Sequence, residues 1–133
     1  MNEPPHTFKN RGGFARLTGA FRYSFAGFRH AIRNEPAVRQ ELAVLVILTP
    51  VSAMLPVSNV EHLILVLTMM LVVLVEFLNS AIESAVDRIS RERHPLSGQA
   101  KDMGSAAVFI SVLMWGLSWL VIVGPLVSRA FRS

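Results

Sequence analysis

The sequence predicts an all-α membrane protein with three transmembrane helices and an amphipathic surface helix before them. The chain has 133 residues and is 52% hydrophobic, which is too apolar for an ordinary soluble domain of this length. Three long apolar stretches are separated by short polar links. The region before these stretches instead has apolar residues at helical steps of three and four.

The first thirteen residues show no periodic pattern. Residues 1–13 are polar and rich in proline and glycine, which predicts a flexible tail. We expect no signal peptide, because the first thirty residues lack a continuous apolar core. The chain has no cysteine, so neither a disulfide framework nor a thiolate metal site is expected.

Residues 14–34 have the pattern of an amphipathic helix. We expect this helix to lie in the membrane interface, because the rest of the chain offers no soluble core on which it could pack. The apolar positions are Phe14, Leu17, Phe21, Phe25, Phe28 and Ile32, and the basic positions between them are Arg16, Arg22, Arg29 and Arg33. A basic helix of this kind indicates contact with anionic lipid headgroups or a phosphate-bearing ligand, and we expect no nucleic acid partner.

The three spanning helices are expected within residues 35–128. The first apolar stretch, Leu42–Leu55, is short for a membrane span and contains Pro50. We therefore expect it to take extra length from Pro36–Glu41, or to lie in a thinned bilayer.

The second and third spans are longer. The second is expected from Val60 to about Ile89, and its later half carries acidic residues. The third is expected over Met103–Val127, where two glycines and Pro125 interrupt the apolar sequence without necessarily breaking a helix inside a bundle.

Basic residues are distributed unevenly along the chain. Seven of the thirteen lysines and arginines lie between Lys9 and Arg39, and four more lie in the second link. Only Arg129 and Arg132, in a basic tail at residues 129–133, follow the third span. The positive-inside rule therefore predicts that the N-terminus and the second link are cytoplasmic and that the C-terminus is outside.

The second span carries an acidic face directly after an apolar run. At 100° per residue, Asn79 lies about 60° from Glu76, and Glu83 and Asp87 lie within about 20° of it. Glu76 and Glu83 are about 10 Å apart along the axis, from the 1.5 Å rise per residue. Carboxylates near membrane depth usually face a protein interior where they carry out chemistry or move ions.

These carboxylates, with basic residues nearby, are the ingredients of a phosphoryl-transfer site. Carboxylate oxygens can hold Mg²⁺ together with substrate phosphates, while lysine and arginine neutralise charge on the transferred group. A further carboxylate can accept the proton of an attacking hydroxyl. The sequence contains neither a P-loop motif nor a kinase-type glycine loop, so such a site would be built from helices.

Several stretches resemble the small bacterial integral-membrane diacylglycerol kinases. They are Asn34–Glu35, Arg39–Glu41, Val75–Glu83, Val86–Arg88, Ser97–Gly98 and Ala100–Ala107. The resemblance implies a homotrimer in the bacterial inner membrane, with a periplasmic C-terminus and active sites between protomers at the cytoplasmic interface. It also implies MgATP-dependent phosphorylation of diacylglycerol to phosphatidic acid.

The resemblance also implies residue roles. Glu76 matches the general base that acts on the lipid hydroxyl, and Asn79, one turn away, is expected to orient Glu76 or the phosphate. Glu35 and Glu83 match the carboxylates that hold the magnesium ion of MgATP. The nucleotide-contacting positions are Arg16, Tyr23, Glu92, Arg93, His94, Lys101 and Asp102, where Arg93 replaces an aromatic residue common in relatives. The positions at the lipid headgroup are Arg16, Ala20, Tyr23, Ser24, Arg39, Gln40, Glu41, Glu76 and Ser105.

Three alternatives remain open from the residues. The same chemistry on undecaprenol is possible, although the Met-Gly-Ser sequence after Lys101-Asp102 favours the diacylglycerol branch. A small ion or drug transporter subunit would also use an intramembrane glutamate, but it would need neither the Lys-Asp pair nor the basic helix. Finally, Glu76 or Glu83 could serve only in a structural ion pair with Arg39 or Lys101.

Overall fold

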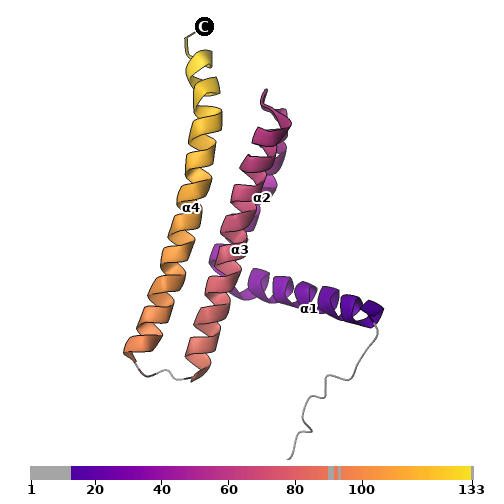
Figure 1. The fold of residues 1–133 in the computed structure, drawn as a ribbon, viewed down its shortest axis with the longest axis vertical. Coiled ribbons are helices and arrows are strands. Elements are labelled where there is room, and N and C mark those ends of the chain that lie inside the picture. Colours follow the sequence, from indigo (N-terminus) through magenta and orange to yellow (C-terminus); the bar gives the residue numbers. More distant parts are fainter. Residues whose placement is uncertain (1–12, 90–91, 93, 133) are drawn as a thin grey trace, which may run out of the picture.

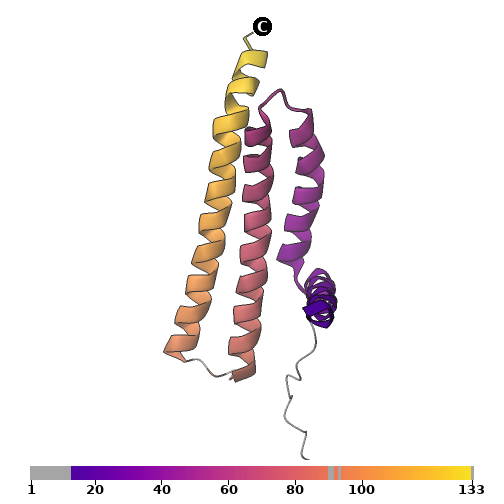
Figure 2. The ribbon, with the colours of Figure 1, turned by 45° about the vertical axis from the view of Figure 1, so that its right-hand side comes forward.

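The computed structural model describes residues 13–89, 92 and 94–132, and these form four helices with no strand (Figure 1). The helices are α1 (Gly13–Asn34), α2 (Pro36–Met54), α3 (Asn59–Ile89) and α4 (Pro95–Ala130). The last three are long and apolar enough to cross a membrane, as the sequence predicts. They run side by side, with α3 between α2 and α4 (Figure 2), while α1 points sideways from the bundle (Figure 1).

The first span, α2, gains its length at its N-terminal end. It begins at Pro36, whose fixed φ suits the first turn of a helix, after Glu35 in an extended conformation. The 19 residues of α2 give a length of about 28 Å, close to the thickness of the hydrocarbon core. The helix continues through Pro50. Helix α2 therefore includes Pro36–Glu41, which is one of the two sources of extra length that the sequence predicts.

The start of α3 is fixed by a capping box. The backbone N–H of Ser58 donates to the Glu61 carboxylate at 2.7 Å, and the Glu61 N–H donates to the Ser58 hydroxyl at 3.3 Å. These two bonds satisfy backbone donors that a helix start leaves free. Glu61 thus caps the N-terminal end of α3, far from the acidic face.

The third span starts earlier than the sequence analysis predicts. We expected it to begin at Met103, but α4 begins at Pro95, where the ring of His94 accepts a hydrogen bond from the Leu96 N–H at 3.2 Å. The apolar pattern misses the first turns of α4 because they are polar. Lys101 consequently lies well inside the helix rather than at its start.

Helices α3 and α4 are too long to be enclosed by a bilayer. Their 31 and 36 residues correspond to about 46 and 54 Å, against about 30 Å for the hydrocarbon core. The end of α3 and the start of α4 extend together past the level of α1 (Figure 1). This shared extension brings polar residues of both helices beyond the apolar part of the bundle.

The packed interior lies mainly along α3. Leu65, Met69, Val72 and Val73 are buried there, and Thr68 shares a hydrogen bond of 2.9 Å with Ser118 of α4. On the other side, α1 is held close to α3 by an edge-to-face contact between Phe28 and Phe77, whose ring centroids are 5.0 Å apart. Most apolar side chains of α4 are exposed in the single chain, as expected for surfaces that face lipid or other protomers.

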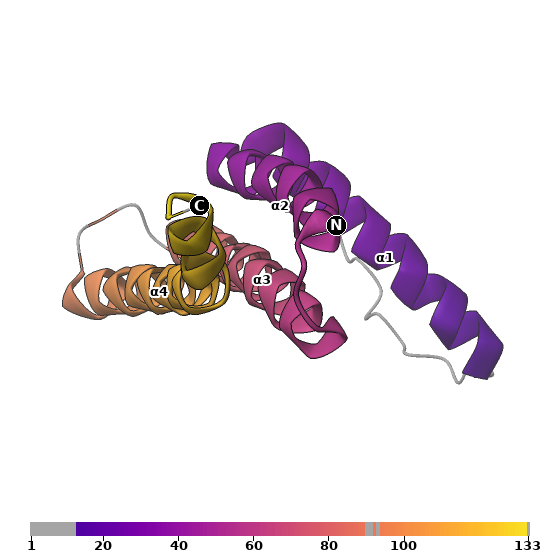
Figure 3. The same cartoon turned by 90° about the horizontal axis from the view of Figure 1, so that it is seen from above.

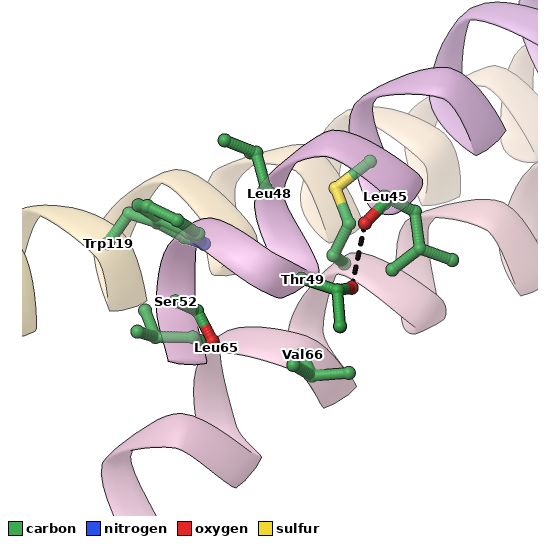
Figure 4. A pocket seen from close by; sticks show the side chains of 8 residues that line it. Leu45, Leu48, Thr49, Ser52, Leu65, Val66 and Trp119 are labelled. Carbon is green, nitrogen blue, oxygen red and sulfur yellow. Dashed lines mark hydrogen bonds between the residues drawn. The ribbon is translucent and has the colours of Figure 1, made fainter. Parts of the chain in front are cut away.

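A small apolar pocket lies between α2, α3 and α4 (Figure 4). The Thr49 hydroxyl donates to the Leu45 carbonyl of its own helix at 2.7 Å, so its polar group is already used. The lining residues are Leu45, Leu48, Thr49, Ser52, Leu65, Val66, Met69 and Trp119. The pocket lies two to three turns of α3 before the acidic face and offers no ionisable group for catalysis.

Candidate active site

The first part of the acidic face of α3, at Glu76 and Asn79, is turned into the protein. Glu76 and Asn79 are only 8% and 9% exposed, although they follow a run of apolar residues on the same helix. Burying polar groups is unfavourable unless they are hydrogen-bonded or paired, so their position needs a compensating interaction or a function. The predicted one-face arrangement is therefore present, and its two central members are buried.

Asn79 connects the members of this face. Its Nδ2 donates to Oε1 of Glu83 at 3.2 Å, one helical turn further along. Its Oδ1 is buried and has no hydrogen-bond partner among the described residues. The amide thus positions Glu83 and leaves an acceptor oxygen unused.

Three carboxylates lie close enough to interact electrostatically with Glu76: Glu83 on the same helix, Glu41 on α2, and Glu35 between α1 and α2. The charges of Glu83 and Glu35 act on Glu76, and the charge of Glu76 acts on Glu41. Glu35 stands between α1 and α2 without capping the helix that follows it, and Oε2 of Glu41 is buried without a partner in the described part of the chain. Like charges gathered in a partly buried site repel, so a bound cation would stabilise the cluster.

The carboxylates of this site fit a metal ion that binds together with the phosphates of a nucleotide. In the described residues, no three acidic or histidine side chains are arranged to hold a metal by themselves. Mg²⁺ usually takes one or two protein carboxylates and completes its shell with water and substrate phosphates. Glu35 and Glu83 could supply these carboxylates, because neither is committed to an ion pair in the described residues.

The structural ion pairs considered for Glu76 and Glu83 are not formed. Nη1 of Arg39 donates to the carbonyls of Ile32 and Arg33, each at 3.2 Å, at the end of α1. Nζ of Lys101 instead lies 2.6 Å from Oδ1 of Asp87. In the part of the chain that the structure describes, no basic side chain forms an ion pair with Glu76 or Glu83.

Lys101 nevertheless stands beside the acidic face. The charge of Glu83 acts on Lys101, and the Lys101–Asp87 pair joins the extended end of α3 to the first turns of α4. The two side chains are 40% and 61% exposed, so an ammonium group is available to an anionic ligand that approaches from water. The sequence predicts no role for Asp87, because its partner Lys101 is 14 residues away and becomes its neighbour only through the packing of α4 against α3.

The remaining predicted positions are exposed and dispersed. Arg16, Ala20, Tyr23 and Ser24 lie on the part of α1 that runs away from the bundle (Figure 3), where the Arg22 guanidinium covers the Tyr23 ring at 5.4 Å. Other exposed positions are Gln40, Glu92, His94, Asp102 and Ser105. Arg93 lies outside the described residues. A single chain therefore brings the carboxylates and Lys101 together but not the first half of α1.

Comparison with known proteins gives matches over most of the chain. Residues 22–123 match the family model of prokaryotic diacylglycerol kinase. A diacylglycerol kinase of Pseudomonas aeruginosa is 47% identical over 118 residues, which cover 89% of this chain and 96% of that relative. A diacylglycerol kinase of Escherichia coli K12 is 44% identical over 113 residues, or 85% and 93% of the two chains. One of Helicobacter pylori is 40% identical over 107 residues, or 80% and 84%.

Proposed function

Because this chain belongs to the prokaryotic diacylglycerol kinase family, we propose that it transfers the γ-phosphoryl group of MgATP to diacylglycerol, and that Glu76 is the general base. The family makes the chain a phosphotransferase that acts on an alcohol group. One observation supports this site above the others. The buried Glu76 lies within electrostatic reach of Glu83 and Glu35, and in the described residues none of the three forms an ion pair.

The proposed reaction is an in-line displacement. The hydroxyl oxygen of diacylglycerol forms a bond to the γ-phosphorus while the bond between that phosphorus and the β,γ-bridging oxygen breaks. Glu76 accepts the hydroxyl proton, and the leaving ADP takes the electron pair of the broken bond. The products are phosphatidic acid and ADP.

Glu35 and Glu83 would hold the magnesium ion that accompanies ATP. When bound, this ion neutralises charge on the phosphates and offsets the repulsion within the carboxylate cluster. The Asn79 amide keeps the Glu83 carboxylate in place through its 3.2 Å hydrogen bond. Lys101 would exchange Asp87 for a phosphate oxygen, since both partners of that ion pair are accessible to water.

We propose the remaining contacts from the family resemblance. The nucleotide side would include Arg16, Tyr23, Glu92, Arg93, His94 and Asp102. The lipid side would include Arg16, Ala20, Tyr23, Ser24, Arg39, Gln40, Glu41 and Ser105. Arg16 and Ala20 precede residues 22–123, so the family match supports them less directly than the others.

A homotrimer with shared sites would bring these groups together. In one chain the first half of α1 points away from α3 and α4 (Figure 3), so Arg16 and Tyr23 cannot serve the same chain's Glu76 in this arrangement. A neighbouring protomer can supply them. The many exposed apolar side chains of α4 provide a surface for such assembly.

We propose that the reaction takes place at the cytoplasmic headgroup plane of the bacterial inner membrane. Diacylglycerol stays in the bilayer and MgATP stays in water, so transfer has to occur where the two meet. The exposed Phe21 and Phe25 of α1 suit insertion at this plane, and the basic residues around them favour a cytoplasmic N-terminus and a periplasmic C-terminus. Since the chain has no cysteine, a single introduced cysteine at either end, probed with an impermeant maleimide, tests this orientation.

An assay with several lipid alcohols tests the proposed function. The purified full chain in mixed micelles, given labelled ATP and Mg²⁺, is expected to label diacylglycerol at least tenfold faster than undecaprenol or monoacylglycerol. Such a ratio corresponds to about 1.4 kcal/mol of preference between the transition states. Faster labelling of undecaprenol would identify undecaprenol as the preferred substrate. No labelling of any lipid would contradict the proposal.

A further inference from the structure

Helix α4 presents a buried glycine to the side chain of Asn79. A Cβ atom added to Gly104 would overlap Oδ1 of Asn79, and it would lie 3.4 Å from Cγ and 3.9 Å from Cα of the same residue. By contrast, a Cβ at Gly98 or Gly116, also on α4, would meet nothing within 4 Å. The requirement for glycine is therefore specific to this point of the helix.

Because Gly104 has no side chain, the Asn79 amide can lie against α4. Asn79 is 9% exposed and is confined between Gly104 on one side and Glu83 on the other. Its Nδ2 faces an oxygen of Glu83, and the reverse orientation would turn Oδ1 toward that carboxylate, which would repel it. The orphan Oδ1 faces α4 for this reason, in a space that a methyl group would fill.

We propose that Gly104 is a positioning residue for phosphoryl transfer, because it leaves the space in which Asn79 holds the Glu83 carboxylate. This inference rests on the proposed function of Glu83. Gly104 itself touches no reacting atom; it acts through Asn79. A competing explanation is that Gly104 serves only the close packing of two membrane helices, as small residues often do.

Kinetics of Gly104→Ala distinguish the two explanations. We expect kcat to fall about 10–100-fold, as is typical when a group supporting a metal-binding carboxylate is lost, while KM for lipid changes less than about twofold. Gly116→Ala is the matched control on the same helix and should keep wild-type kinetics. In an Asn79→Ala background, Gly104→Ala should lower kcat by less than about twofold more, because the group it displaces is already gone. Losses that multiply would show that Gly104 acts independently of Asn79 and would overturn the inference.

A spectroscopic measurement separates this inference from the proposed function. The side-chain amide signal of Asn79 in ¹⁵N-labelled protein, identified by its loss in Asn79→Ala, should shift in Gly104→Ala and stay in place in Gly116→Ala. An unmoved signal in Gly104→Ala would overturn the inference. A shifted signal in a protein whose wild type phosphorylates no lipid would leave the geometry correct and the proposed function wrong.

The double variant also covers the case in which Gly104→Ala does not fold. If overlap with Asn79 is the cause, Asn79→Ala combined with Gly104→Ala removes the overlap and should restore a folded protein. A double variant that also fails to fold would show that α4 needs Gly104 for backbone packing, which would contradict a role through Asn79.

Discussion

Replacing Glu76 with glutamine is expected to lower kcat by about 10²–10⁴-fold, the usual contribution of a general base. Glutamine has the shape of glutamate, but its amide cannot accept the proton of the lipid hydroxyl. The buried position of Glu76 should tolerate the neutral side chain, because no ion pair in the described residues is lost. Turnover of diacylglycerol in mixed micelles measures the effect, and thermal unfolding and elution volume verify the fold and the assembly.

A second glutamate on the same helix is the control. Glu61→Gln should keep turnover close to wild type, because glutamine can also serve in the capping box with Ser58. Glu76→Gln protein within a few-fold of wild type would show that Glu76 is not the base. If sites are shared between protomers, chains carrying Glu76→Gln should regain activity when assembled with chains carrying Arg16→Ala, since some sites then contain neither substitution.

Lys101→Ala is expected to lower kcat by about 10²–10³-fold, the range found when one donor to a developing negative charge is removed. Its ammonium group stands beside Glu83, and its partner Asp87 is exposed, so a phosphate oxygen can replace that partner. Steady-state kinetics with each substrate varied in turn should show KM for lipid nearly unchanged. Arg129→Ala, at the opposite end of α4, is the control and should behave as wild type.

Variants of α1 should lower the apparent affinity for lipid and leave the use of ATP nearly unchanged. Phe21→Ser combined with Phe25→Ser removes two exposed rings from the face that is proposed to enter the headgroup region. The apparent affinity for lipid should fall about 100-fold or more, because two fully buried rings contribute about 1.5–3 kcal/mol each, while KM for ATP stays within about twofold. If Lys101→Ala also changed only KM for lipid, the proposed position of the nucleotide beside Lys101 would be wrong.

Local patterns in the sequence predict most of the helices. The steps of three and four before Asn34 predict α1, and the long apolar run before Glu76 predicts α3. The start of α4 was predicted too late, because hydropathy registers only the apolar residues from Met103 onward. His94 followed by Pro95 is a cap and first-turn signal that identifies the earlier start once it is considered.

The sequence predicts the site only in part, because some of its contacts depend on how the helices pack together. The placement of Glu76, Asn79 and Glu83 on one face follows from the helical period, and the Asn79–Glu83 hydrogen bond agrees with it. The proximity of Glu35 to Glu76 depends instead on how α1 and α2 meet α3. The contact between Gly104 and Asn79 depends on the register of α4 against α3, which no local pattern specifies.

We propose that Glu83 of α3 and Glu35, between α1 and α2, together hold the divalent cation of the nucleotide. The most direct test uses full-length protein with ¹³C-carboxyl-labelled glutamate, a non-hydrolysable ATP analogue, and paramagnetic Mn²⁺ in place of Mg²⁺. We expect the carboxyl signals of Glu35 and Glu83 to broaden when cation and analogue are both present. The signal of Glu61, about 33 Å from Glu83 along α3, should stay sharp. Sharp signals from Glu35 and Glu83 with bound Mn²⁺ and nucleotide would contradict the account.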